Sequence, residues 1–156
     1  MIIRNFQEKD FEQAKEIFAL YWTDPEFLKE LSSELQVFID MKGNGTSGFF
    51  VAEEDNKIIG IIGYKKLVDY LKPYTLTDNP VEFYVIAVKN KRMGVGKKLK
   101  QKLLEEAQKL GFSEIILYSP GTHDESWHFH DSQGFERLGE VTPPDDDIGQ
   151  VWRKVL

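Results

Sequence analysis

The chain has 156 residues, of which 41% are hydrophobic and 13% aromatic, enough for the core of one folded domain over residues 1–156. Its 20 basic and 26 acidic residues give a net charge of −6, which argues against a nucleic-acid-binding surface. The absence of cysteine excludes disulfides and thiolate metal sites. With no signal peptide and no apolar run approaching about 18 residues, we expect a soluble cytoplasmic protein that does not enter a membrane.

The first part of the chain predicts a strand and two helices. Residues 2–6 form the strand, and residues 10–21 form a helix that begins with a capping box made by Asp10 and Gln13. A second helix over residues 24–41 begins with an Asp-Pro pair, which is typical of a helix start.

Two β-rich runs follow, over residues 49–53 and 58–64. Asp55 and Asn56 lie between them, so the sequence predicts a hairpin. Residues 68–80 lose this periodicity and form a long ordered loop. The loop is either a plain connector or one wall of a binding pocket.

Residues 81–88 form the next strand, and it carries a carboxylate. Alternation places Glu82, Tyr84, Ile86 and Val88 on one face. A carboxylate buried among apolar neighbours tends to have a raised pKa and then accepts a proton near neutral pH. Glu82 is therefore a candidate general base, and the alternative is a structural ion pair.

A basic, glycine-containing turn over residues 91–96 leads from this strand into a helix that ends at Gly111. The apolar residues of this helix are three or four apart, so they form a buried stripe with the lysines and glutamates on the other side. The stripe consists of Val95, Leu99, Leu103, Ala107 and Leu110.

The start of that helix predicts an anion site. Unpaired N–H groups and a partial positive charge favour an anion there, and glycines let a phosphate approach the backbone. The alternative is a turn whose lysines are merely solvated. A P-loop is excluded because Lys91 and Lys98 occupy its first glycine and its Ser/Thr positions, and the dinucleotide fingerprint would need a glycine at Leu99.

The last part of the chain predicts a strand at residues 114–118, a helix at 125–133, and strands at 135–141 and 150–155. The three aspartates at 145–147 form either a solvated turn or a rim that recruits an amine.

Three histidines in this part invite a metal interpretation, which we reject. On a helix His128 and His130 would point roughly 200° apart, and His123 adds no third ligand at a diagnostic spacing. We therefore expect no metal.

Three segments resemble the GNAT superfamily of N-acetyltransferases. The family's acyl-CoA-binding motif, Q/R-x-x-G-x-G/A after a strand ending in valine, stands here as Lys91-Arg92-Met93-Gly94-Val95-Gly96 after Val88, with Lys91 departing from the usual Gln or Arg. FFVAEEDNKIIGIIGY resembles the central hairpin. WHFHDSQGF resembles the closing motif, with Phe129 at the aromatic position, His130 in place of tyrosine and His123 in place of asparagine.

The resemblance implies an α/β fold with a mixed, mostly antiparallel sheet flanked by helices, and transfer of an acetyl group from acetyl-CoA directly to a primary amine. It implies catalytic roles for Glu82 and His130. It also implies a cosubstrate site made by Ile86, Val88, Lys91, Arg92, Met93, Gly94, Val95, Gly96, Lys97, His123 and Phe129. Homodimers are frequent in the family, so a homodimer is a candidate state. The departures at Lys91 and His130 keep open an alternative, a non-catalytic domain that only binds acyl-CoA.

Overall fold

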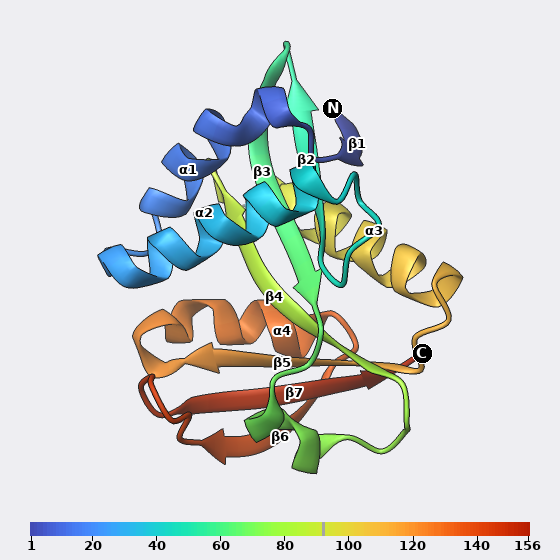
Figure 1. Cartoon of the computed structure of the whole chain (residues 1–156). Helices are drawn as coiled ribbons and strands as arrows, with labels where there is room; N and C mark the ends of the chain where they lie inside the picture. The colour runs from blue at the N-terminus through green and yellow to red at the C-terminus, as the bar shows by residue number, and fades with distance from the viewer. Residues whose placement is uncertain (92) are drawn as a thin grey trace. The chain divides into compact units, whose positions relative to one another are not determined.

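The computed structural model describes residues 1–91 and 93–156, and its strands form one sheet in the order β1-β2-β3-β4-β5-β7-β6 (Figure 1). The strands are β1 Ile2–Asn5, β2 Gly48–Glu54, β3 Lys57–Lys65, β4 Pro80–Val88, β5 Glu114–Pro120, β6 Glu136–Val141 and β7 Gly149–Val155. The α-helices are α1 Phe11–Ala19, α2 Pro25–Asp40, α3 Val95–Lys109 and α4 Trp127–Ser132, and 3₁₀ helices cover Glu8–Asp10, Asp69–Tyr74 and Gly121–Ser126.

The strand pairing is mixed and mostly antiparallel. The pairs β1–β2, β2–β3, β5–β7 and β6–β7 are antiparallel, whereas β4 and β5 are parallel. This confirms the predicted fold class and the predicted order of strands and α-helices. The 3₁₀ helix Asp69–Tyr74 replaces part of the expected loop.

The chain divides into two compact units. The first contains residues 1–64 and 85–105, and the second contains residues 65–84 and 106–156. Strand β4 begins in the second unit and ends in the first.

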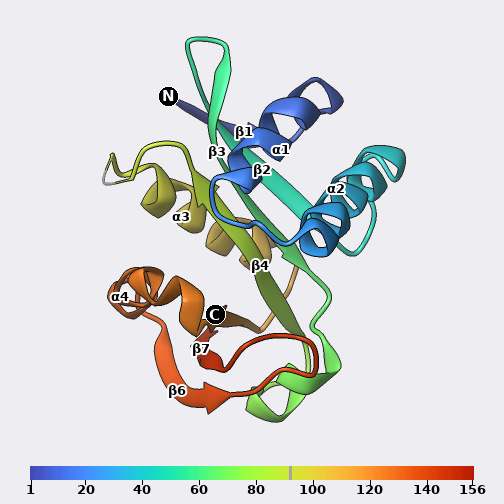
Figure 2. The same ribbon diagram turned by 90° about the vertical axis from the view of Figure 1, so that its left-hand side faces the viewer.

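The first unit is built on the hairpin of β2 and β3. Asp55 and Asn56 have positive φ angles of 52° and 62°, the left-handed pair that a tight two-residue hairpin turn requires. Helices α1 and α2 lie on one side of the hairpin and α3 on the other (Figures 1 and 2). Asp24 caps α2 as predicted, because its carboxylate accepts the Glu26 N–H at 3.1 Å.

Helix α3 follows the predicted stripe except at two positions. Val95, Leu99, Leu103 and Ala107 are buried, whereas Leu110 is 54% exposed and Lys100 is completely buried. The prediction was therefore wrong for these two, since Leu110 lies beyond the last helical residue and one lysine faces inward. A Cβ on Gly60 would lie 3.0 Å from Leu99, so this glycine allows α3 to approach β3 closely.

The predicted capping box of Asp10 and Gln13 was also wrong. Asp10 accepts hydrogen bonds from Arg4 at 2.7 and 2.9 Å and from the Gln7 N–H at 2.9 Å. Gln13 instead accepts the Ile58 N–H at 3.1 Å. Burial alone would raise the pKa of Asp10, but the hydrogen bonds from Arg4 and Gln7 outweigh it and lower the pKa.

The second unit places different side chains on the two faces of its sheet. Val151 of β7 packs with Leu71 of the 3₁₀ helix Asp69–Tyr74, together with Leu67 and Ile116. Its neighbour Trp152 points to the opposite face, because successive residues of a strand alternate. On that face α4 packs, with the Trp127 and Trp152 rings 6.1 Å apart.

The buried carboxylate of Glu114 fixes the segment that precedes β4. It accepts the Leu76 N–H at 2.9 Å, the Thr77 N–H at 2.7 Å and the Thr77 hydroxyl at 2.7 Å. These donors compensate for the loss of water around a side chain with no exposed surface. Glu114 therefore has a structural role.

Within residues 1–91 and 93–156, every helix is too short or too polar to cross a lipid bilayer.

Candidate functional site

The turn after β4 places glycine at the start of α3. Gly94 has φ +77°, and no described atom lies within 4 Å of the position that a Cβ would take. The Lys98 N–H donates to the Gly94 carbonyl at 3.2 Å, so the preceding N–H groups of the helix have no partner inside it. Helix α3 has 15 residues, long enough for a full dipole at this end.

Some residues around the turn are packed against the first unit, and others are exposed around the start of α3. Val95 is buried and Gly96 half-buried, which fixes the first helical turn on the first unit. Lys91, Met93 and Lys97 are exposed. Arg92, also predicted here, lies outside the described residues. A backbone cradle with lysines around it suits a phosphate group.

The end of β4 is held from two sides within the first unit. The Lys89 N–H donates to the Ile59 carbonyl at 2.8 Å, and the Tyr21 hydroxyl donates to the Val88 carbonyl at 2.7 Å. Ile86 and Val88 are half-buried, while the alternating Val85 and Ala87 are buried. The predicted pair thus shares the less covered face of the strand.

Glu82 lies in the second unit, in a partly polar environment. It is 7% exposed, and its Oε1 accepts the Val68 N–H at 3.2 Å. It faces Ile116 in the β4–β5 register, so it shares the face on which Leu71 packs.

Two tyrosines and a run of aspartates belong to the same environment. The rings of Tyr70 and Tyr118 are 6.1 Å apart at 83°, and the Tyr118 hydroxyl donates to the Asp147 carbonyl. Burial raises the pKa of both phenols, with the charges of Glu82 and Asp146 adding to the effect at Tyr70 and those of Asp146 and Asp147 at Tyr118. Negative potential of this kind attracts a cation. The sequence pointed to Glu82 and the aspartates but missed both tyrosines.

His130 lies on α4 among aromatic rings. It is 4% exposed, and its ring is 5.8 Å from that of Phe83 and 5.0 Å from that of Trp152. Phe129 is half-buried beside it, with the ring centroids 5.6 Å apart. His123 lies in the preceding 3₁₀ helix, where its carbonyl accepts the Ser126 hydroxyl at 2.8 Å.

The two candidate catalytic side chains therefore lie on opposite faces of the second unit's sheet. Phe83, which contacts His130, follows Glu82 on β4, and neighbouring residues of a strand point to opposite faces. The same separation appears on β7 between Val151 and Trp152. The family motifs identify both residues, but they do not specify the face of the sheet on which each one lies.

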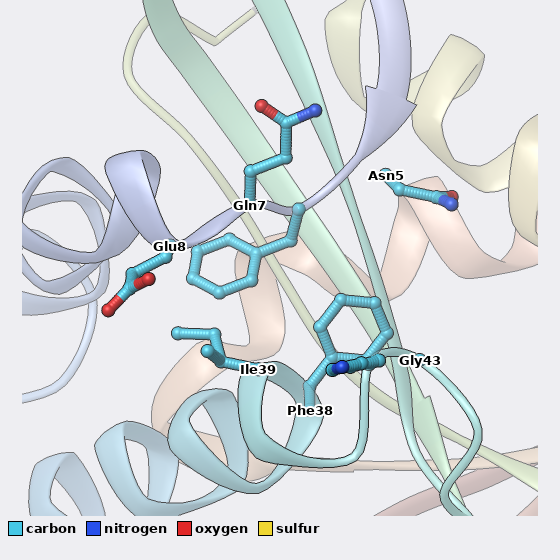
Figure 3. Close-up of a pocket in the computed structure, with 8 residues that line it drawn as sticks. Asn5, Gln7, Glu8, Phe38, Ile39 and Gly43 are labelled. Carbon is cyan, nitrogen blue, oxygen red and sulfur yellow. The ribbon is translucent and has the colours of Figure 1, made fainter.

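A cavity of about 360 Å³ lies elsewhere, in the first unit. Figure 3 shows that Asn5, Gln7 and Glu8 extend in different directions around it. A binding site usually has polar groups that converge on the ligand, so we do not assign the reaction to this cavity. It is lined by Asn5, Phe6, Gln7, Glu8, Phe38, Ile39, Lys42 and Gly43.

Among the residues that the structure describes, no three His, Asp or Glu side chains come together as a metal-binding group.

The sequence matches a known protein family and two curated relatives. Residues 12–135 match the family model described as "Acetyltransferase (GNAT) family". Human N-acetyltransferase 8 is 26% identical over 124 residues, covering 76% of this chain and 52% of that protein. Human N-acetyltransferase 8B is 28% identical over 112 residues, covering 70% and 45%. The chain thus spans about half the length of these curated relatives.

Solved structures share the fold. A protein assigned to the GNAT acetyltransferases of Desulfovibrio desulfuricans superposes with a TM-score of 0.81 at 15% identity, covering 99% of this chain and 98% of that one. PaiA N-acetyltransferase of Thermoplasma acidophilum, solved in complex with coenzyme A, has a TM-score of 0.72 at 20% identity, covering 99% and 98%.

Proposed function

The chain belongs to the GNAT acetyltransferase family, and from this premise we propose that it transfers an acetyl group from acetyl-CoA to a primary amine by direct attack. One observation carries the proposal: the start of α3 combines Gly94, with open space at its Cβ position, and helix N–H groups that have no partner inside the helix.

The cosubstrate would be held mainly by backbone. The pyrophosphate would lie against the turn at residues 91–97, with the exposed Lys91 and Lys97 beside it. The pantetheine arm would pair with the backbone N–H and C=O groups of Ile86 and Val88, two half-buried residues at the end of β4. Burying few long side chains leaves little side-chain entropy to be lost on binding.

The reaction needs a neutral amine, because only its lone pair can attack the thioester carbonyl. We assign Glu82 as the group that takes a proton from the acceptor ammonium. The amine nitrogen then bonds to the carbonyl carbon, and the carbon–sulfur bond breaks once the tetrahedral intermediate has formed. As the thiolate leaves, the nitrogen loses its second proton and the sulfur takes up one proton, giving an amide and the CoA thiol. Glu82 returns its own proton to solvent, so the reaction of an ammonium releases one proton overall.

The acceptor would be a cation before it reacts. The charges that raise the pKa of Tyr70 and Tyr118 come from Glu82, Asp146 and Asp147, and such a group of carboxylates favours an ammonium over a neutral alcohol. This supports a primary amine as the acceptor class.

The role of His130 as proton donor to the thiolate stays a prediction. Its packing among Phe83, Phe129 and Trp152 favours a structural role, and this observation also favours the second candidate function. In that alternative, the domain binds acyl-CoA without turning it over.

The test compares the two ends of α3. Gly94 and Gly111 both have positive φ, 77° and 85°, and open space around the Cβ position, so a glutamate adds similar backbone strain at either. We expect Gly94→Glu to lower CoA affinity at least 100-fold, measured by calorimetry, because it puts a carboxylate where a phosphate would bind. Gly111→Glu should bind like the wild type.

Turnover then separates the two functions. Acetyl-CoA and a panel of primary amines are incubated with the wild type, and release of the CoA thiol is followed. Release that depends on one of the amines supports the transferase. Tight binding with no amine-dependent release supports the binding domain, and a wild type that binds no CoA contradicts both.

A further inference from the structure

Tyr21 connects helix α1 to the predicted cosubstrate turn through two contacts. It lies just after the helix, where its N–H donates to the Phe18 carbonyl at 3.0 Å. Its hydroxyl donates to the Val88 carbonyl at 2.7 Å, and the Lys91 Nζ lies 5.4 Å from the centre of its ring. One side chain therefore reaches both the last residue of β4 and the first residue of the turn.

The hydroxyl contact fixes a backbone group. A carbonyl oxygen has two lone pairs, so a donor on one of them orients the peptide and leaves the other available. Val88 is the last residue of β4, and the Lys89 N–H beside it is already bound to Ile59. With Tyr21 on the carbonyl and Ile59 on the N–H, the peptide that joins Val88 to Lys89 is held from both ends.

The ring contact restrains a charge. An ammonium over a phenol ring is attracted by the ring's negative face, which limits the positions that an exposed lysine visits. Lys91 is exposed and occupies the first position of the turn, so the ring keeps its ammonium close to the start of α3. A lysine restrained in this way loses less entropy when it meets a phosphate.

Tyr21 itself is held by other rings of the same unit. Trp22 lies 5.9 Å from it, and the Trp22 ring packs 6.0 Å from Phe18 and 5.4 Å from Phe27 of α2. The packing of α1 and α2 therefore holds Tyr21 in addition to its contacts with Val88 and Lys91.

We propose that Tyr21 is a positioning residue for the cosubstrate. Its hydroxyl orients the Val88 carbonyl that pairs with the pantetheine arm, and its ring holds the Lys91 ammonium near the place where the pyrophosphate binds. This inference rests on the proposed function, because it assumes that acyl-CoA binds along β4 and the turn.

The experiment separates the two contacts with two variants and two acyl donors. Tyr21→Phe removes the hydroxyl and keeps the ring, whereas Tyr21→Leu removes both. Acetyl-CoA carries the pyrophosphate, and acetyl-pantetheine lacks it. KM and kcat are measured for each donor, with the melting temperature of each variant recorded.

We expect Tyr21→Phe to raise KM about threefold to tenfold for both donors, the usual effect of one lost hydrogen bond. Tyr21→Leu should raise KM about twofold to fivefold further for acetyl-CoA only, because the cation–π contact acts on the phosphate end. The kcat should change less than twofold in both. Lys91→Gln should remove the additional effect of the leucine.

The control is Phe11→Leu, which removes another cation–π contact of the same unit, between the Phe11 ring and Lys15 at 5.6 Å. It should leave both KM values unchanged. A wild type that binds acetyl-CoA while both Tyr21 variants keep its KM overturns this inference alone, as does an equal ring effect on both donors or a loss confined to kcat. A wild type that does not bind CoA contradicts the proposed function itself.

Discussion

The two faces of the second unit's sheet bury different kinds of side chain. On one face lie Glu82 and the Tyr70–Tyr118 pair, with Asp146 and Asp147 close enough to shift the pKa of the phenols. On the other face, rings surround His130, and Arg137 lies 5.2 Å from the Trp152 ring. Both titratable candidates are buried, so burial does not distinguish them. Their neighbours do, because charges and phenols suit a cationic substrate and packed rings suit a core.

The largest effect should come from Glu82→Gln. If the polar face is the reacting one, losing the base lowers kcat about 10²- to 10⁴-fold, while CoA affinity and melting temperature stay near those of the wild type. Single-turnover measurements at saturating acetyl-CoA give the rate of the chemical step. A kcat within threefold of the wild type would remove Glu82 from the mechanism.

The second effect concerns the other buried glutamate of the polar face. In the β4–β5 pairing, Glu82 lies opposite Ile116 and Pro80 lies opposite Glu114. Glu114 is two residues before Ile116 on β5, so it lies on the same face as Glu82. Because its carboxylate accepts bonds from Leu76 and Thr77, Glu114→Gln should lower the free energy of unfolding by about 1–3 kcal/mol, measured by urea denaturation. Turnover per folded molecule should not change. A loss of kcat without loss of stability would contradict the structural role.

A smaller effect is expected on the aromatic face. His130→Phe keeps a ring among Phe83, Phe129 and Trp152, so we expect stability to change by about 1 kcal/mol or less and kcat by less than threefold. A fall of 100-fold in kcat, with the wild-type pH profile changed on its alkaline side, would instead support the proton-donor role that the family resemblance implies.

The smallest effect involves Asp131, which accepts from Arg137 at 2.7 Å and from the Trp152 indole N–H at 2.9 Å. These hydrogen bonds lower its pKa. Since the folded state then holds its proton less tightly than the unfolded state, the stabilisation is present above about pH 4 and is lost as the pH falls below that. Asp131 is half exposed, so we expect less than about 1 kcal/mol.

Comparing the unfolding free energy of the wild type and Asp131→Asn at pH 7 and pH 3 tests this. The difference between the two proteins should shrink at pH 3. An unchanged difference would show that the carboxylate charge contributes nothing.

Features determined by adjacent residues could be predicted from the sequence. The Asp55-Asn56 turn, the Asp24-Pro25 helix start and the glycine turn at the start of α3 each depend on the local conformational preferences of a few residues. The order of strands and α-helices follows from such local signals and from periodicity.

Features that depend on distant partners could not. Tyr21 and Val88 are 67 positions apart, and no pattern near either predicts their bond. Asp10 has a good capping sequence, yet Arg4 binds it more strongly than the helix end does. The separation of Glu82 from His130 depends on which face of β4 meets α4, and a motif that names residues does not specify faces.

The division of the chain has a consequence for synthesis on the ribosome. The first unit draws on residues 1–64 and then on 85–105, so it cannot be completed until Glu105 has been made. At 5–20 residues per second that is a wait of roughly 2 to 8 s after Tyr64. For the first part of this wait, roughly 1 to 5 s until Val88 has been made, β3 lacks its neighbour β4 and presents an unpaired edge, which exposes the nascent chain to aggregation.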